Sequence, residues 1–328
     1  MRLPGMPEPD AGPSSKSFSA AQMNEEKIAI ARLSVYSNTL LVILKVIAGV
    51  IMGSVAVISE AIHSSIDLIA AVIARYSVKM SSEPADKEHR FGHGKYENLS
   101  GMVEGVLIFV AASGIIYKAV KRLLGPVEVQ ELPAGMAVMG ISAVLNFFVA
   151  RKLFKVAKKT ESLALEADAY HLQTDVWTSV GVFTAFVLIG LTNQHWLDPA
   201  IAIVVAAIII HAAYDITKRS TEGLLDKSLP DAEILRIEQI MKEHEITFVD
   251  FHKLRTRKVG SERQIDLHLT VHKNMSVKQG HDLVDHLEKE IKKEFPASIA
   301  VIHIEPCDDK CKRCPPPAPM EKDPEEQQ

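Results

Sequence analysis

Residues 55–80 of the chain read VAVISEAIHSSIDLIAAVIARYSVKM, an apolar run with His63 and Asp67 near its middle. The hydrocarbon core of a bilayer is about 30 Å thick, and about 20 residues of apolar helix cross it. The run is long enough to do so, and it predicts a transmembrane helix. An ionisable side chain inside such a helix costs several kcal/mol unless it is paired or hydrated, so His63 and Asp67 point to a function.

Five further apolar stretches flank this run. They are approximately Leu33–Met52, Leu99–Leu123, Ala134–Phe154, Leu163–Leu191 and Pro199–Ala213. The first of them joins residues 55–80 through a short connection at Gly53, which favours an antiparallel hairpin. The sequence therefore predicts an all-α transmembrane domain of six helices over residues 29–218, embedded in a lipid bilayer.

The distribution of basic residues predicts the orientation of these helices. Lys and Arg gather between the second and third spans, between the fourth and fifth, and after the sixth. Cytoplasmic loops carry such an excess, so an integral multi-pass membrane protein with both termini in the cytoplasm is expected, in the cell (inner) membrane if the source is bacterial. The net charge is only −4 and no dense basic tract occurs, so nucleic acid is not an expected partner.

The last third of the chain has a different, more polar pattern. An amphipathic helix to about His244, strands at Thr247–Lys258 and Arg263–His272, a helix at Ser276–Phe295 and a strand at Ser298–Glu305 are predicted. This order predicts a small cytoplasmic α+β domain over residues 219–306. Residues 1–28 and the Cys-, Pro- and acid-containing tail 307–328 are expected to be disordered.

The strongest chemical signal is a repeated spacing. His63 precedes Asp67 by four residues in the second span, and His171 precedes Asp175 by four in the fifth. Positions i and i+4 share one face of a helix. Two such helices facing each other offer two nitrogens and two oxygens, which suits a tetrahedral Zn²⁺ site. The alternative is that the imidazoles bond to helix backbones while the acids line a water-filled crevice.

Two other charged residues lie in apolar stretches, Lys45 and Glu104. We interpret them as snorkelling side chains or members of a structural ion pair.

Two polar segments outside the spans also resemble metal sites. Asp86, His89 and His93 lie within eight residues of a loop that contains Gly92 and Gly94, and they either converge on one ion or form a solvated charged loop. In the α+β domain, strand alternation puts polar residues on the sheet face away from the helices. That polar face includes His252, His268, His303 and Glu305. Such a face suits metal sites at a dimer interface, or else surface histidines.

Cys307, Cys311 and Cys314 either capture soft metal or form an incidental redox-sensitive tail.

The paired intramembrane motifs, together with the loop phrase PADKEHRFGHGK at residues 84–95, resemble the cation diffusion facilitator family from about Glu26 to Pro306. The resemblance implies a homodimer, one transport site per protomer, exchange of metal for protons, and a ferredoxin-like or metallochaperone-like αββα-type cytoplasmic domain. It implies transport ligands at His63, Asp67, His171 and Asp175, and a second site at Asp86, His89 and His93. It also implies a binuclear site at His252, His268, His281 and His303, with Glu305 where some members have Asp. Lys95 and Asp226 match an ion pair between protomers.

The predicted function is efflux of a divalent transition metal, most simply Zn²⁺. The metal is the substrate and a regulatory ligand, and no catalytic cofactor or enzymatic activity is expected. The alternatives are a member that prefers Fe²⁺, Co²⁺ or Cd²⁺, and a membrane metal sensor or assembly protein with little transport. An intramembrane metalloprotease is disfavoured, because the segment from His244 to Phe248 lacks the second His of an HExxH motif.

Overall fold

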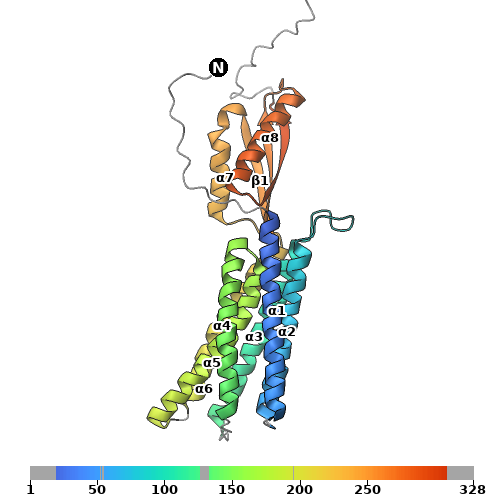
Figure 1. The fold of residues 1–328 in the computed structure, drawn as a ribbon. Coiled ribbons are helices and arrows are strands. Elements are labelled where there is room, and N and C mark those ends of the chain that lie inside the picture. Colours follow the sequence, from blue (N-terminus) through green and yellow to red (C-terminus); the bar gives the residue numbers. More distant parts are fainter. Residues whose placement is uncertain (1–19, 52, 54, 126–132, 195, 309–328) are drawn as a thin grey trace, which may run out of the picture.

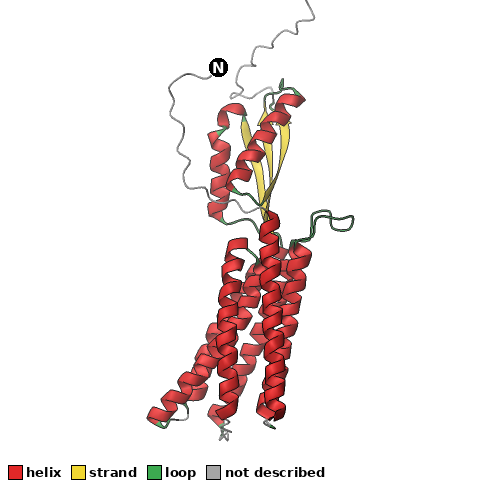
Figure 2. Cartoon of the chain, in the orientation of Figure 1, coloured by secondary structure: helices red, strands yellow, loops and turns green. Residues whose placement is uncertain are grey.

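The structure is a computed structural model that describes residues 20–51, 53, 55–125, 133–194 and 196–308. Six long helices form a bundle, and a small α+β domain lies beyond one end of it (Figure 1). The helices are α1 (Ala20–Ile51), α2 (Val55–Ser81), α3 (Lys95–Leu124), α4 (Pro133–Thr160), α5 (Leu163–Thr192) and α6 (Leu197–Leu224). The predicted fold class, a helical transmembrane domain followed by an α+β domain, is confirmed (Figure 2).

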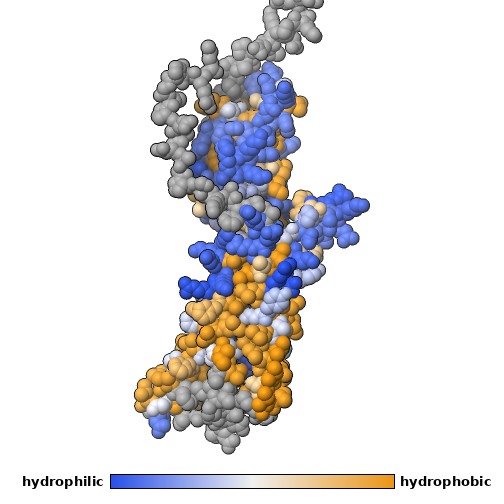
Figure 3. Space-filling view, viewed as in Figure 1, coloured by the Kyte–Doolittle hydropathy of each residue, from blue (hydrophilic) through white to orange (hydrophobic). Residues whose placement is uncertain are grey.

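On the face of the molecule that Figure 3 shows, the surface of the helical bundle is largely apolar and that of the α+β domain is mostly hydrophilic. In the described part of the chain, α1, α2, α3, α5 and α6 each contain a segment long and apolar enough to span a membrane. The remaining helix, α4, has 28 residues and lies in the same bundle, but its second half is basic. Arg151, Lys152, Lys155, Lys158 and Lys159 all lie there.

The first helix begins at Ala20, earlier than the sequence indicates. Lys27 is 3% exposed, and its Nζ lies 2.9 Å from Oε1 of Glu97, which is 1% exposed. This ion pair holds the first turns of α1 against the start of α3. Glu26 also forms an ion pair with Lys159. Residues 20–28 are therefore helical, where the charged composition predicted disorder. The rest of that predicted segment, residues 1–19, lies outside the described residues.

The α+β domain has two helices on one face of a three-stranded sheet. Its elements are α7 (Asp231–Glu243), a 3₁₀ turn (Glu245–Thr247), β1 (Asp250–Val259), β2 (Glu262–Val271), α8 (Val277–Glu294) and β3 (Ser298–Pro306). The strand order is β1-β2-β3, with β1 antiparallel and β3 parallel to β2. Alternate β2 side chains, Ile265, Leu267 and Leu269, are at most 1% exposed and pack with apolar residues of α7 and α8. The other sheet face is therefore left for polar residues.

Cys307 belongs to this domain, although the sequence places it in the tail. Its N–H donates to the carbonyl of Val271 at 2.8 Å, and the residue is 6% exposed. The other two cysteines, Cys311 and Cys314, for which metal capture and an incidental redox-sensitive tail are the alternatives, lie outside the described residues.

The β1–β2 hairpin joins the domain to the bundle. A Cβ on Gly94 would lie 2.7 Å from the carbonyl oxygen of Val259, so the hairpin and the end of the α2–α3 loop touch through their backbones. At the α4–α5 turn, Glu161 accepts hydrogen bonds from Arg263 at 3.0 and 3.2 Å. The Nζ of Lys95 lies 3.0 Å from Oδ1 of Asp226 in the same chain, whereas the family resemblance implies a pair between protomers.

Candidate metal centres

The transmembrane residues meet across two antiparallel helices. In α2, His63 lies farther from the α+β domain than Asp67 does. Because α5 runs the other way, His171 lies closer to that domain than Asp175 does. We call the end of the bundle nearest the α+β domain the inner end and the opposite end the outer end. Each histidine therefore faces the aspartate of the other helix. Nε2 of His171 lies 2.8 Å from Oδ1 of Asp67, and Nε2 of His63 lies 4.0 Å from Oδ1 of Asp175. His63, Asp67 and Asp175 each present one ligand atom within 4.8 Å of the others.

The two sides of this group differ in burial. Asp67 and His171 are 3% and 7% exposed, whereas the His63 side chain is about half exposed. The group is thus closed by the bundle on one side and open on the other. His171 is therefore enclosed by the bundle, whereas His63 lies at its surface.

A fifth residue, which sequence reasoning did not identify, contacts the transmembrane group. Asn146 of α4 is 3% exposed, and its Nδ2 donates to Oδ2 of Asp175 at 3.0 Å. This hydrogen bond orients the Asp175 carboxylate. Its signal in the sequence is an amide inside an otherwise apolar stretch, which membrane helices use mostly for contacts with each other.

Lys45 and Glu104, for which the sequence supports the same interpretation, have different surroundings in the structure. Nζ of Lys45 lies 2.8 Å from Oγ of Ser64 and 3.5 Å from Oε2 of Glu60, so the predicted structural ion pair is confirmed. Glu104 is fully buried, and among the described residues it forms no ion pair with Lys or Arg. For Glu104, both snorkelling and a structural ion pair are therefore wrong.

The loop residues form a second group between α2 and α3. Asp86, His89 and His93 each offer a ligand atom within 4.8 Å of the others. The Asp86 carboxylate lies 3.6 Å from Nδ1 of His89 and 3.4 Å from Nε2 of His93. The backbone N–H groups of His89 and Glu88 donate to it and lower its pKa, so the carboxylate stays ionised and available as a ligand.

The third group lies on the open face of the sheet. His252 pairs with His268, and His268 with His303, across the three strands. Oε1 of Glu305 lies 2.6 Å from Nδ1 of His268, and its Oε2 lies 3.2 Å from Nε2 of His252. The longer side chain of Glu305 thus reaches both imidazoles. The hydrogen bond from His268 lowers the pKa of Glu305.

The remaining two histidines of the predicted binuclear site are less closely placed. Nε2 of His303 lies 3.9 Å from Oε1 of Glu305, at the edge of the third group. His281 is exposed on α8 and does not join the group, and it interacts electrostatically with Asp285. Beside these residues, Ile299 and Val301 of β3 are 50% and 57% exposed. Polar candidate ligands and apolar side chains therefore share a strand whose outward face is not covered by any of the residues that the structure describes.

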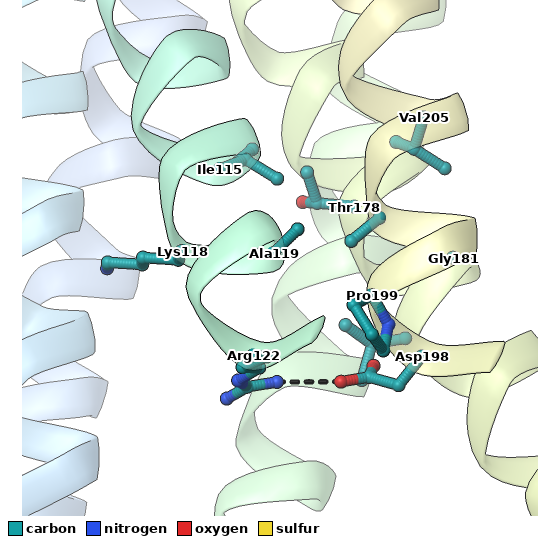
Figure 4. Close-up of a pocket in the computed structure, with 11 residues that line it drawn as sticks. Ile115, Lys118, Ala119, Arg122, Thr178, Gly181, Asp198, Pro199 and Val205 are labelled. Carbon is teal, nitrogen blue, oxygen red and sulfur yellow. Dashed lines mark hydrogen bonds and ion pairs between the residues drawn. The ribbon is translucent and has the colours of Figure 1, made fainter. Parts of the chain in front are cut away.

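A cavity of about 200 Å³ lies between α3, α5 and α6 (Figure 4). Its lining includes the last turns of α3 and the first turns of α6, at the end of the bundle away from the α+β domain. Thr178, which lines it, donates a hydrogen bond to the backbone carbonyl of Asp175, so the cavity begins about one turn beyond the transmembrane group. Nη1 of Arg122 lies 2.7 Å from Oδ2 of Asp198 at its far end, and this ion pair bridges α3 and α6.

Comparisons with known proteins agree with this architecture. The family profile of the cation efflux transmembrane domain matches residues 31–225, and the profile of the cytoplasmic domain of cation efflux proteins matches residues 229–307. The chain is 39% identical to the uncharacterized transporter sll1263 of Synechocystis sp. over 285 residues, 85% of this chain and 92% of the relative. It is 31% identical to the cation-efflux pump FieF of Salmonella typhi over 283 residues, 86% of this chain and 92% of the relative.

A solved structure of CzrB, described in connection with zinc transport, is 33% identical and covers 24% of this chain and 99% of its own, with a TM-score of 0.24. The family profiles together cover both parts of the fold, and the relatives align over most of the chain. The chain is therefore a multi-pass membrane protein of the cation diffusion facilitator, or cation efflux, family.

Proposed function

We propose that the chain works as a homodimer that exports a divalent transition metal, with Zn²⁺ as the preferred ion, from the cytoplasm in exchange for protons. The observation that carries the proposal is the crossed contact of two helices, with His171 against Asp67 and His63 against Asp175. Two imidazoles and two carboxylates match the donor types and number of a four-coordinate zinc site. Fe²⁺, Co²⁺ and Cd²⁺ are the competing ions, because affinity orders overlap.

Proton exchange follows from the ligand chemistry. The carboxylates and imidazoles bind metal only when they have lost their protons, so metal and proton compete for the same atoms. Protons that enter from the outer side displace the ion there, and an inward proton gradient then drives efflux. Imidazole titrates near neutral pH, which makes His63 and His171 the proton carriers of this proposal.

The loop group and the sheet group are proposed as further metal sites, the latter regulatory. Metal at His252, His268 and Glu305 adds positive charge to a sheet face that also exposes Ile299 and Val301. We assign this face to the homodimer interface, with His303 and His281 completing the metal sites there. Metal binding would then tighten the dimer and shift its conformational equilibrium when cytosolic metal rises. In this arrangement both termini lie in the cytoplasm.

Transport in proteoliposomes with clamped internal and external pH tests the proposal. The purified full chain is presented with Zn²⁺, Fe²⁺, Co²⁺ and Cd²⁺ in turn, with and without a proton gradient. Asp67→Asn and Asp175→Asn should each abolish metal flux. Asp215→Asn is the matched control, since Asp215 lies on α6 in an exposed pair with Arg219. Unchanged flux in the first two variants would reject the transport site, whereas absence of flux in the native chain would favour a membrane metal sensor.

A further inference from the structure

Two buried carboxylates lie beside the transmembrane group but outside it. Glu104 of α3 is 0% exposed and Asp168 of α5 is 1% exposed. Asp168 precedes His171 by three residues, about 4.5 Å along the helix toward the end nearest the cytoplasmic domain. Glu104 interacts electrostatically with both Asp168 and His171. The two acids therefore lie near each other on the side of the proposed transport site that is closer to the α+β domain.

Most oxygens of this pair have no hydrogen-bond partner. Oε1 of Glu104 accepts from Oγ of Ser100 at 3.0 Å, but its Oε2 and both oxygens of Asp168 are buried and unpartnered. A third helix contributes a further group of this kind. Ser34 of α1 is 0% exposed, and its hydroxyl lies beside the Asp168 carboxylate without completing a hydrogen bond of normal geometry. Buried polar atoms in native proteins nearly always have a partner, so these oxygens are available to bind a ligand.

The charges of the bundle lead to the same conclusion. Lys27 compensates Glu97, and Lys45 compensates Glu60. Among the described residues, neither Glu104 nor Asp168 forms an ion pair with Lys or Arg. A neutral imidazole at His171, as metal binding there requires, does not compensate them either. Two uncompensated carboxylates in a membrane interior match the charge of one divalent cation.

An orienting role toward His171 explains these acids less well. A carboxylate that orients a metal-binding histidine accepts a hydrogen bond from its second ring nitrogen. Nδ1 of His171 is buried and has no hydrogen-bond partner. The acids thus lie near the histidine without holding it.

We propose that Glu104, Asp168 and Ser34 form a second divalent-cation site inside the membrane, which the transported metal occupies before it reaches His171 and Asp67. This inference rests on the proposed function. The donor set is all oxygen, which binds Zn²⁺ more weakly than a set with imidazoles. An ion at the inner site would therefore pass readily to the transport site, and weak sites in series allow an ion both to enter and to leave.

Zinc binding to the full chain in lipid nanodiscs tests this site directly. The starting variant carries Asp67→Asn, Asp86→Asn, Asp175→Asn and Glu305→Gln, which removes a carboxylate from each of the three other groups. Equilibrium dialysis against radioactive Zn²⁺ counts the ions bound per chain. Adding Glu104→Gln with Asp168→Asn should lower that count by one. Ser34→Ala, which changes no charge, should weaken the same binding step.

Glu60→Gln is the matched control, because Glu60 also lies on a membrane helix but has Lys45 as its partner. It should leave the count unchanged. In the otherwise native chain, Glu104→Gln should raise the KM for Zn²⁺ about tenfold with little loss of maximal rate, as expected for a lost entry site. An unchanged zinc count in the Glu104→Gln, Asp168→Asn chain overturns the second site. Absence of metal flux in the native chain overturns the proposed function instead, and flux that survives Asp67→Asn overturns the proposed transport site, so these failures are distinguishable.

Discussion

The guanidinium of Arg263 links the two parts of the molecule, because it donates to Glu233 within its own domain and to Glu161 at the α4–α5 turn. The N–O distances are 2.7 Å to Glu233 and 3.0 Å to Glu161, and Arg263 is 9% exposed. Lys258 also forms an ion pair with Glu161. Partial burial alone would raise the pKa of Glu161, but these two cations outweigh it and hold that pKa below its usual value. Glu161 lies two residues before the start of α5, the helix that carries His171 and Asp175.

Replacing Glu161 should loosen this contact. Glu161 has a φ of 53°, a conformation that Asn tolerates well, so Glu161→Asn removes the carboxylate without adding backbone strain. Since Glu161 is partly exposed, we expect a loss of about 0.5–1 kcal/mol in the contact between the domains. Amide hydrogen exchange at the tip of the β1–β2 hairpin should quicken several-fold. Asp285→Asn, which breaks an exposed pair with Lys289 on α8, should leave that exchange rate unchanged.

Asn146 should act as a positioning residue for Asp175. Removing a group that hydrogen-bonds a metal ligand typically lowers metal affinity or activity by about 10–100-fold. Asn146→Leu should therefore raise the KM for metal transport by an amount in that range. Ser142→Ala is the control, because Ser142 is a buried polar residue of the same helix whose Oγ donates to the Val138 carbonyl. Equal effects of the two substitutions in the flux assay would argue against a specific role for Asn146.

The ion pair of Lys27 and Glu97 should be important for stability. Both residues are nearly fully buried, and removing one partner leaves the other charge without compensation, at a typical cost of about 3–5 kcal/mol. Lys27→Met should lower the thermal unfolding temperature in detergent clearly. Lys27→Met combined with Glu97→Gln should recover most of the loss, since no charge then remains. A double variant as unstable as the single one would contradict this account.

The contact of Glu305 with His268 predicts a pH dependence. The pKa of Glu305 is lower in the folded chain than its usual value of 4.5, so this contact stabilises the fold fully above about that pH. The stabilisation is lost as the pH falls through the lowered pKa. Without metal, Glu305→Gln should therefore lower the unfolding temperature at neutral pH, and the difference from the native chain should shrink toward pH 4. A difference that grows on acidification would show the opposite sign.

Much of the architecture can be predicted from the sequence because it follows from local patterns. Apolar runs indicated the helices of the bundle, and strand alternation indicated that the polar residues would lie on the sheet face away from the helices. The start of α1 could not be predicted this way. Lys27 is a charged residue that becomes buried only because Glu97, 70 residues away, compensates it.

Among the candidate site residues too, those set by local spacing could be predicted from the sequence, and those that depend on a neighbouring helix could not. Spacing brought His63, Asp67, His171 and Asp175 to notice, and the structure places them together, while metal binding there stays a prediction. Asn146 and Asp168 could not be identified from spacing, because each depends on a neighbouring helix. Glu104 was misinterpreted because the sequence does not show whether a cation lies nearby. His281 stays a predicted ligand that the single chain does not bring to the others.

The backbone contact between Gly94 and the β1–β2 hairpin couples the transmembrane bundle to the α+β domain by a means that does not depend on charge. The pairs of Lys95 with Asp226 and of Glu161 with Arg263 weaken as salt screens them. Steric exclusion between backbones does not weaken in this way. At high salt concentration, a shift of the α2–α3 loop would therefore still displace the hairpin through backbone contact. Coupling between the domains by steric contact would persist after the ion pairs have weakened.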